Sequence, residues 1–263
     1  MEKSEEMKSK SQIARTPPPD VRLELRREVG FGCPLCGNPH LEYHHFDPPW
    51  RINKHHSAEG MIALCARHHN EADSGAFTNE QLRNLKKNNH TRVQSKFNWR
   101  RKHTVFACGG NYAYDCTAML TARGIDMIYF EKDDDGYDTL SLKIYDTCLN
   151  PIAVMRKNDW ICRNNVDEIE ATPRTPKLII KSKIHRIDFE LFFKDRGNMN
   201  ETEIKVLDDF NIPEYEEALL VKVRGKLPAP CSAIFSDDRL IVDGRLFFSG
   251  NKFISSNKAI VLG

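Results

Sequence analysis

Up to residue 104, the apolar positions of the chain form short segments separated by polar turns. Residues 1–20 are charged and Ser-rich, then Pro-rich, and without apolar periodicity they are expected to form a disordered tail. Residues 21–29 place valine and leucine among arginine and glutamate, which predicts a short helix. Residues 41–46 alternate like a strand, and residues 61–64 form a second short apolar run. The pattern therefore predicts one helix and two short strands in this region.

Two more helices are predicted after the second strand. Residues 65–72 are expected to open a helix, because His68, His69 and Ala72 fall within about two turns. Thr78-Asn-Glu-Gln81 is a capping-box pattern, with Thr at the N-cap and Gln at N3. It predicts the start of a helix that runs into a basic stretch of the chain.

After Thr104 the pattern changes to β-branched and aromatic segments separated by turn signals. Residues 194–216 are expected to be a polar connection, and Asp133-Asp134-Asp135-Gly136 predicts a hairpin turn. The strand-like segments are residues 126–131, 139–145, 176–181, 186–193, 218–223 and 239–262. We therefore expect an α+β fold in which a small N-terminal domain precedes a mainly antiparallel β domain, sandwich-like or barrel-like.

The expected domain boundaries follow these changes in pattern. A disordered tail covers residues 1–20, and an N-terminal domain that ends in a basic helix covers residues 21–102. A β-rich domain covers residues 103–196, and a β-rich extension, residues 197–263, is expected to pack on it. The length of 263 residues is comfortable for two domains.

The composition indicates a globular protein of the cytoplasm. Hydrophobic residues make up 40% of the chain and charged residues 29%. No apolar run approaches the ~20 residues that a membrane span needs, and the N-terminus is too polar for a signal peptide. We therefore expect a cytoplasmic protein without a membrane partner, whose cysteines are thiolates rather than disulfides.

The net charge of +2 hides an asymmetry between the two parts of the chain. Residues 1–102 hold 18 Lys and Arg against 12 Asp and Glu, whereas the remainder holds 21 against 25. Between Arg83 and Lys102 there are eight basic residues and no acidic one. Such a one-sign run favours a polyanionic partner, and the alternative is a solvated basic linker.

Cysteine and histidine are concentrated in one stretch. Seven of the ten histidines lie between His40 and His69. Cys33-x-x-Cys36 and Cys65-x-x-His68 have the spacing of zinc-knuckle ligand pairs, in which two residues between ligands let both side chains converge on one tetrahedral ion. These four residues are the expected ligands of a structural Zn²⁺. The alternative, buried small hydrophobes, fits poorly with the paired spacing.

Three further histidines point to a second centre. On a helix His68 and His69 diverge by about 100°, so they cannot easily serve the same ion. On a strand His44 and His45 point to opposite faces. One of them can therefore meet His69 at a metal while the other faces a substrate.

With these motifs, residues 21–90 resemble the HNH endonuclease family in its zinc-stapled version. His44-His45 matches the doublet that opens the family's ββα-metal finger, and His69 matches the histidine that closes it. The resemblance implies that His44 and His69 bind a catalytic divalent metal and that His45 is the general base. It also implies that residues 21–102 form an HNH nuclease domain.

One position departs from the family. The family usually has Asn, which orients the base histidine, five residues before the cysteine that here is Cys65, and this sequence has Gly60. His56, Ser57 or the Gly60 carbonyl could take over the orienting role. The sequence does not choose among them.

The expected function is metal-dependent hydrolysis of DNA phosphodiesters, by nicking or double-strand cleavage, with a part in restriction or anti-phage defence left open. The catalytic metal is expected to be Mg²⁺ or Mn²⁺, with Zn²⁺ and Ni²⁺ as alternatives, and Asp73 is a candidate additional ligand. The expected DNA-backbone contacts come from Arg51, Lys54, Arg83, Lys86, Lys87, Arg92, Arg100, Arg101 and Lys102.

Two other classes of function remain open at this point. A zinc-stapled DNA-binding module without cleavage is favoured by Gly60 and opposed by the three additional histidines. A zinc scaffold for protein interactions would not retain DNA. The β-rich part shows no catalytic pattern, and it could serve specificity, a homodimer, a protein partner or regulation by a ligand.

Overall fold

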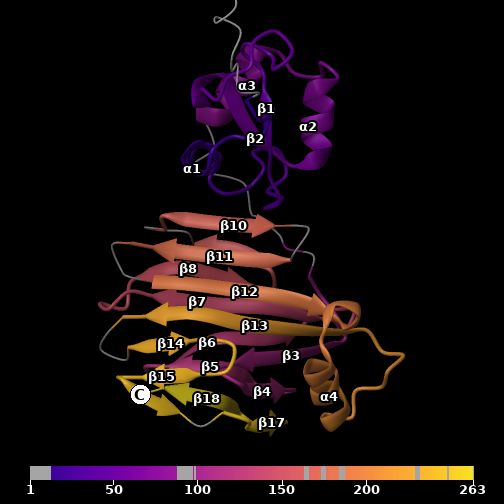
Figure 1. The fold of residues 1–263 in the computed structure, drawn as a ribbon, viewed down its shortest axis with the longest axis vertical. Coiled ribbons are helices and arrows are strands. Elements are labelled where there is room, and N and C mark those ends of the chain that lie inside the picture. Colours follow the sequence, from indigo (N-terminus) through magenta and orange to yellow (C-terminus); the bar gives the residue numbers. More distant parts are fainter. Residues whose placement is uncertain are drawn as a thin grey trace, which may run out of the picture. The chain divides into compact units, whose positions relative to one another are not determined.

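The computed structural model describes residues 13–87, 97, 99–162, 166–172, 176–183, 187–228, 232–247 and 249–262. The chain divides into two compact units (Figure 1). The first comprises residues 1–35 and 41–93, and the second comprises residues 36–40 and 94–263. The division after Val93 lies before the expected boundary at residue 102.

The first unit contains the elements that the N-terminal pattern predicts. They are α1 (Pro19–Glu28), β1 (Glu42–His45), the 3-10 turn η1 (Ala58–Gly60), β2 (Met61–Leu64), α2 (Ala66–Asp73) and α3 (Asn79–Lys87). Helix α1 begins with Pro19 in its first turn, inside the segment expected to be a tail. The capping box is present, because Thr78 N donates to Gln81 Oε1 and Gln81 N donates to Thr78 Oγ1. Helix α3 is described as far as Lys87, and residues 88–96 of the basic stretch lie outside the described residues.

Strands β1 and β2 form an antiparallel hairpin on which α2 packs. The register pairs His44 with Ile62 and His45 with Met61, so both histidines of the doublet are fixed by the ladder. Beneath the hairpin lies a small apolar core. Its buried members are Leu25, Val29, Cys33, Phe46, Met61, Ile62, Ala63, Leu64, Cys65, Ala72 and Leu82.

The second unit is built mainly from antiparallel strands. The larger sheet has the order β10-β11-β12-β13-β14-β15-β16, with β3 beside β13, β4 beside β3 and β17 beside β4. Its strands are β3 (His103–Cys108), β4 (Asn111–Tyr114), β10 (Glu168–Thr172), β11 (Lys177–Ser182), β12 (Ile187–Asp195), β13 (Ala218–Leu227), β14 (Ala233–Phe235), β15 (Leu240–Val242), β16 (Arg245–Phe247) and β17 (Lys252–Ile254).

The smaller sheet has the order β18-β5-β6-β7-β8-β9. Its strands are β5 (Ala118–Ala122), β6 (Ile125–Lys132), β7 (Asp138–Tyr145), β8 (Pro151–Arg156), β9 (Asp159–Cys162) and β18 (Lys258–Leu262). Asp133 to Gly136 forms the turn between β6 and β7, as predicted, with Gly136 at a φ of 81°. The strands β3, β17 and β18 each have one parallel neighbour, and the other pairings are antiparallel.

The two sheets form layers within this unit (Figure 1). Along β12 buried and half-buried positions alternate, so one face of the larger sheet supplies core side chains such as Phe189 and Leu191. Neither sheet closes on itself among the described residues, so the barrel-like alternative is wrong. The α+β class and the mainly antiparallel sheets are confirmed.

Residues 194–216, expected to be a polar connection, contain a helix. Helix α4 (Glu201–Asp209) has a complete capping box, in which Asn200 and Glu203 exchange side-chain to backbone hydrogen bonds. The Asn200-x-x-Glu203 pattern in the sequence is the signal of this helix start. Within the described residues, no helix has the length and hydropathy of a membrane span.

Candidate metal centres and the histidine pocket

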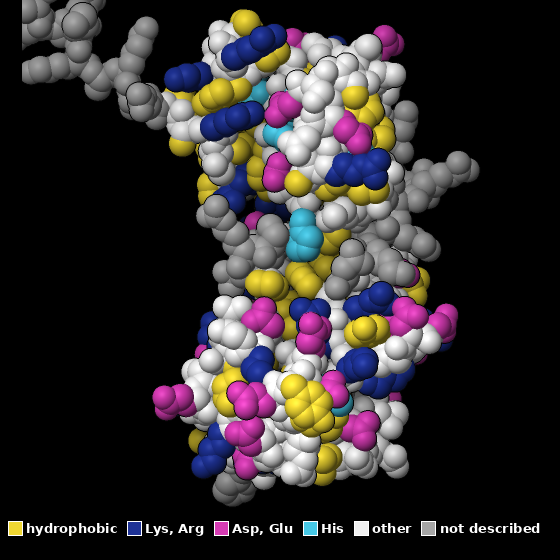
Figure 2. Space-filling model, turned by 90° about the vertical axis from the view of Figure 1, so that its right-hand side faces the viewer, with side chains coloured by type: hydrophobic (Ala, Val, Ile, Leu, Met, Phe, Trp, Pro, Cys, Tyr) yellow, Lys and Arg dark blue, Asp and Glu magenta, His cyan; other side chains and the backbone are white. Residues whose placement is uncertain are grey.

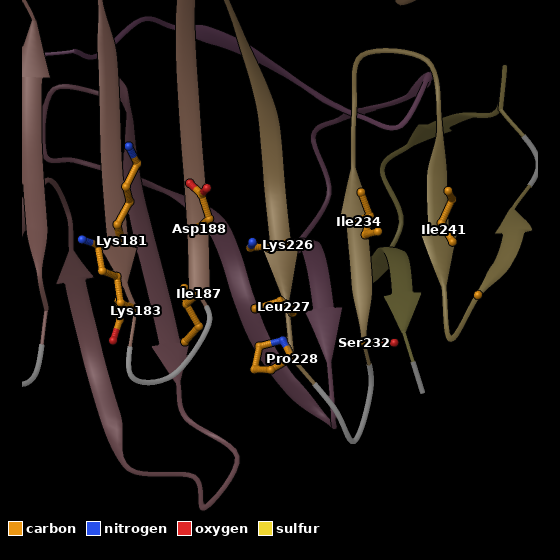
Figure 3. A pocket seen from close by; sticks show the side chains of 12 residues that line it. Lys181, Lys183, Ile187, Asp188, Lys226, Leu227, Pro228, Ser232, Ile234 and Ile241 are labelled. Atoms are coloured by element: carbon orange, nitrogen blue, oxygen red, sulfur yellow. The ribbon is translucent and has the colours of Figure 1, made fainter.

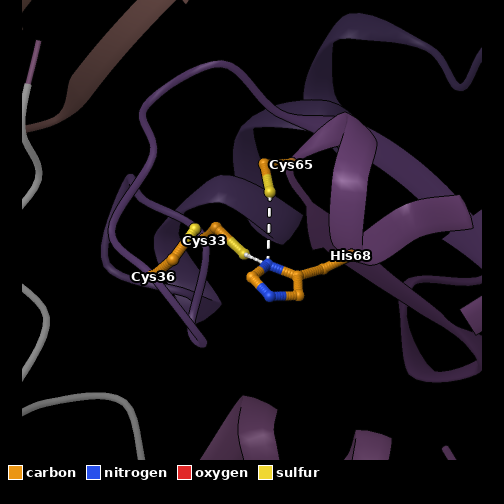
Figure 4. A group of neighbouring side chains, drawn as sticks. All are labelled: Cys33, Cys36, Cys65 and His68. Carbon is orange, nitrogen blue, oxygen red and sulfur yellow. Dashed lines mark hydrogen bonds between the residues drawn. The ribbon is translucent and has the colours of Figure 1, made fainter. Parts of the chain in front are cut away.

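The Cys-x-x-Cys and Cys-x-x-His pairs converge on one point (Figure 4). His68 Nδ1 lies 3.3 Å from Cys33 Sγ and 3.2 Å from Cys65 Sγ, and the four ligand atoms all lie within 4.8 Å of one another. In a tetrahedral site with metal–sulfur bonds of about 2.3 Å and metal–nitrogen bonds of about 2.0 Å, sulfur and nitrogen stand about 3.5 Å apart. The four side chains therefore fit a structural metal ion.

The local fold explains why these side chains meet. Cys65 is the N-cap of α2, which places His68 in the first turn of the helix, facing back toward the cysteine. Cys33 and Cys65 are buried, and Cys36 is exposed. The outer nitrogen of His68, Nε2, lies 3.9 Å from Glu71 Oε2, one helical turn later. A carboxylate in this position orients a ligating imidazole.

His44, His69 and Asp73 form a second group of candidate ligands, separate from the first. Asp73 Oδ1 lies 3.1 Å from His44 Nδ1, and Asp73 Oδ2 lies 3.4 Å from His69 Nδ1. The His44 Nδ1 contact lacks the geometry of a hydrogen bond, and this buried nitrogen has no hydrogen-bond partner among the described residues. Two imidazoles and a carboxylate whose ligand atoms converge within 4.8 Å of one another could hold a cation among them.

The electrostatics of this group suit a ligand set. Burial lowers the pKa of His44, and the neighbouring His69 lowers it further, against the opposing effect of Asp73. A neutral imidazole is the form that binds metals. Glu42, two residues before His44 on β1, adds a second carboxylate 3.6 Å from His69 Nδ1. Glu42 carried no signal in the sequence, because its approach to His69 depends on how α2 packs on the hairpin.

His45, the expected base, is 4% exposed and is held in one tautomer. Its Nε2 lies 3.0 Å from the backbone carbonyl oxygen of His55. Because a carbonyl only accepts, Nε2 carries the proton and Nδ1 keeps a free lone pair. Nδ1 is buried and has no hydrogen-bond partner in the described part of the chain. Burial lowers the pKa of His45 to about 4, so the ring is neutral at pH 7.

The structure resolves which group orients His45. Of the three candidates, the Gly60 carbonyl accepts from the backbone N–H groups of Phe46 and Asp47, His56 stacks on Trp50, and the backbone N–H of Ser57 donates to His55 Nδ1. The orienting group is instead the main chain of His55, which the sequence had not suggested. The loop histidines were expected at the surface or on a substrate. Both are half-buried around His45, with ring centroids 5.3 Å away for His55 and 6.0 Å for His56.

His45 and two members of the second group, His44 and Asp73, face a pocket of about 470 Å³. His44, His45 and Asp73 line it together with Trp50, Phe77 and two arginines. The arginines are Arg51, from the loop after β1, and Arg15, from the segment expected to be disordered. Arg15 is close enough to lower the pKa of both His44 and His45. Composition alone gave no reason to place Arg15 beside the doublet.

The expected DNA-binding cations fall into different environments. Arg51, Lys54 and Lys87 are exposed, and Arg51 and Lys54 have no ion-pair partner among the residues described. Arg83 pairs with Asp47, and Lys86 is held by Glu28 and by the Ala58 carbonyl. Figure 2 shows histidine side chains at the surface of the first unit near lysine and arginine side chains.

The remaining predicted cations lie elsewhere. Arg100 pairs with Asp133 and Asp135 and Arg101 with Glu217, all within the second unit. Lys102 is exposed at the start of the same unit, and Arg92 lies outside the described residues. Two of the expected DNA-binding cations, Arg100 and Arg101, are therefore already paired with acidic residues.

The second unit has an open groove of about 700 Å³ on its larger sheet (Figure 3). Cross-strand partners line it in a row, from Lys181 and Asp188 to Lys226 and then Ile234 and Ile241. The groove offers cationic and apolar contacts. Both groups of candidate metal ligands found among the described residues lie between Cys33 and Asp73, outside this groove.

No protein-family model, curated protein or solved structure matches the chain. Function is therefore inferred from the geometry of the site itself.

Proposed function

We propose that the chain is a metal-dependent HNH-type endonuclease that hydrolyses DNA phosphodiester bonds. The observation that carries the proposal is the pairing of His45 with the group of His44, His69 and Asp73. A buried, neutral imidazole with a free Nδ1 stands on the same strand as a candidate cation site, and both line one pocket. A pure binding module has no need of this arrangement beside a separate Cys₃His site.

In this proposal the Cys₃His group holds a structural Zn²⁺. Three thiolates and one imidazole nitrogen are the donors that tetrahedral zinc takes in closed structural sites. The ion fixes the start of α2 to the loop that carries Cys33 and Cys36, and α2 in turn carries His69 and Asp73. The structural site thus positions two members of the second group.

The protein residues then divide the chemistry among themselves. His45 Nδ1 accepts the proton of the attacking water, and the carbonyl of His55 stabilises the proton on Nε2. His44, His69 and Asp73 hold a divalent cation, which when bound would stabilise the additional negative charge on the phosphate and on the departing oxygen. Arg15 and Arg51 line the same pocket and bind the phosphate groups on either side of the cleaved bond.

DNA binding is proposed to depend on the backbone and on salt. Among the expected cations that the structure describes in the first unit, Arg51, Lys54 and Lys87 are exposed, and Arg15 adds another at the pocket. Contacts between such side chains and phosphates carry little sequence information and weaken as salt concentration rises. Arg83 and Lys86 contribute less than the sequence suggested, because both are engaged with acidic groups of their own unit.

The test is cleavage of supercoiled plasmid by the full chain with Mg²⁺ or Mn²⁺. We expect His45→Ala to reduce the rate by about 10²–10⁴-fold, the usual contribution of a general base. His103→Ala, in β3 of the second unit, is the matched control and is expected to cleave like the wild type. If His45→Ala also cleaves like the wild type, the base assignment is wrong. If the wild type binds DNA but never cleaves it, the chain is a binding module.

A further inference from the structure

We propose that the side chain of His55 is a positioning residue for the base. Its imidazole fixes the loop so that the His55 main-chain carbonyl holds His45 in the Nε2–H tautomer, which leaves Nδ1 free. This inference rests on the proposed function, because it concerns how the base of that reaction is prepared. It also explains how the site works with glycine at position 60.

The His55 ring is bonded at both nitrogens to the main chain of its own loop. Nε2 lies 2.9 Å from the carbonyl oxygen of Pro48, and Nδ1 lies 3.1 Å from the backbone nitrogen of Ser57. The carbonyl requires a proton on Nε2, and the Ser57 N–H requires a lone pair on Nδ1. One neutral tautomer satisfies both contacts. The ring therefore ties the two arms of the loop together at the residue whose carbonyl meets His45.

Position 60 lies so close to Asp47 and His55 that it has no room for a side chain. A Cβ atom at this position would lie 1.9 Å from the Asp47 carbonyl oxygen and 2.9 Å from Cε1 of His55. The backbone of Asp47 excludes any side chain there, and the imidazole of His55 fills the volume into which such a side chain would extend. An orienting residue cannot be supplied from position 60, and the neighbouring loop supplies it from position 55.

The other groups around His45 do not fulfil this role. His56 packs with Trp50, with ring planes 27° apart, and its Nδ1 has no hydrogen-bond partner within the described chain. The rings of Trp50 and His45 are tilted by 52° relative to each other, with centroids 4.7 Å apart. Both neighbours limit where the imidazole of His45 can lie. Neither determines which of its nitrogens carries the proton.

The tautomer of His45 can be measured directly in the full-length protein labelled with ¹⁵N-histidine. Long-range ¹H–¹⁵N spectra distinguish a protonated from an unprotonated ring nitrogen, and the signals of His45 are assigned by their loss in His45→Gln. We expect the wild type to show only the Nε2–H form. In His55→Phe, which keeps the ring and loses both hydrogen bonds, we expect a mixture of the two tautomers.

Cleavage kinetics provide a second readout. We expect His55→Phe to lower kcat by about 10–100-fold, the usual effect of losing a group that orients an active-site imidazole, with little change in KM. Ser57→Pro tests the same device independently, because the Ser57 φ of −71° suits proline and only the N–H bonded to His55 is lost. It is expected to lower kcat less than His55→Phe does. His56→Phe is the matched control and should leave the His45 tautomer unchanged.

The outcomes separate this inference from the proposed function. A wild type with His45 in the Nδ1–H form, or a folded His55→Phe whose His45 tautomer and kcat equal those of the wild type, would overturn the positioning role. If His55→Phe does not fold, the same comparison on Ser57→Pro decides. A wild type that shows the Nε2–H tautomer but cleaves no DNA would instead refute the endonuclease proposal, because the spectrum does not depend on activity.

Discussion

Replacing Cys65 by serine should unfold the first unit while the second unit stays folded. Cys65 is buried, is the N-cap of α2 and supplies one of the three thiols of the Cys₃His group. Serine keeps the size of the side chain but is a poor ligand for a soft metal site. We therefore expect the substitution to act mainly by preventing metal binding at this group.

The structure indicates how large the effect should be. The core of the first unit contains few large buried apolar side chains, namely Leu25, Val29, Phe46, Met61, Ile62, Leu64 and Leu82. At about 1.5–3 kcal/mol each, they contribute roughly 10–20 kcal/mol before the entropy of folding is subtracted. A structural zinc contributes about 10–16 kcal/mol, the same order as the whole core. Since domains are stable by only about 5–15 kcal/mol, loss of the ion should leave this unit unfolded.

Calorimetry and limited proteolysis of the full chain can test this. We expect the wild type to show a transition that a zinc chelator removes, and a protease-resistant fragment that begins near residue 94 after chelation. Cys65→Ser should behave like the chelated wild type. Cys148→Ser, at an exposed cysteine of the second unit, is the control. The reasoning would be refuted if Cys65→Ser kept the full protease resistance and both transitions of the wild type.

Three further predictions concern single side chains. Asp73→Asn should weaken Mn²⁺ binding at the second centre by at least about 10-fold in titration calorimetry, because a charged ligand is lost. Glu80→Gln in α3 is the control and should bind Mn²⁺ like the wild type. Equal affinities of Asp73→Asn and the wild type would show that Asp73 is not a ligand. Gly60→Ala should cost about 1–3 kcal/mol or more in chemical denaturation, because its Cβ would overlap the Asp47 carbonyl, and Gly197→Ala, which has room, should be close to neutral. Burial tends to raise the pKa of Glu203, but hydrogen bonds from Lys194, the Asn200 backbone and Lys222 hold this pKa below the usual 4.5. Glu203→Gln should therefore lower the free energy of unfolding by about 1.5–3 kcal/mol at pH 7. This difference from the wild type should vanish as the pH falls through the lowered pKa; a difference that persists at the acid end would show that the carboxylate charge is not responsible.

The sequence alone determined the elements of the first unit and its ligand pairs. Local signals were sufficient there: alternation predicted β1, a short apolar run predicted β2, and the capping box predicted α3. The spacing of Cys33 with Cys36 and of Cys65 with His68 predicted the first group. The opposite directions of neighbouring residues on a strand, and the divergence of about 100° between neighbours on a helix, separated the second group from the first. These are properties of short segments, and they can be predicted without knowing the rest of the fold.

Only the tertiary structure decided the details that set the chemistry. Arg15 and Glu42 reach the histidines through packing between segments that are distant in sequence or that had no pattern of their own. Lys86 looked available for DNA until its partners, Glu28 and the Ala58 carbonyl, were visible. In the second unit, local strand signals could not choose between an open and a closed sheet, because closure depends on the long-range pairing of strands.

The clearest case is the group that orients His45. The sequence showed that Gly60 was unusual and offered three local substitutes, whereas the hydrogen-bond partner of the His45 ring is a group of another residue. The orienting atom belongs to the main chain of His55, and its position depends on hydrogen bonds to Pro48 and Ser57 and on the exclusion of a side chain at Gly60. A sequence specifies side chains directly, whereas the direction of a loop carbonyl is fixed only when the whole loop has folded around it.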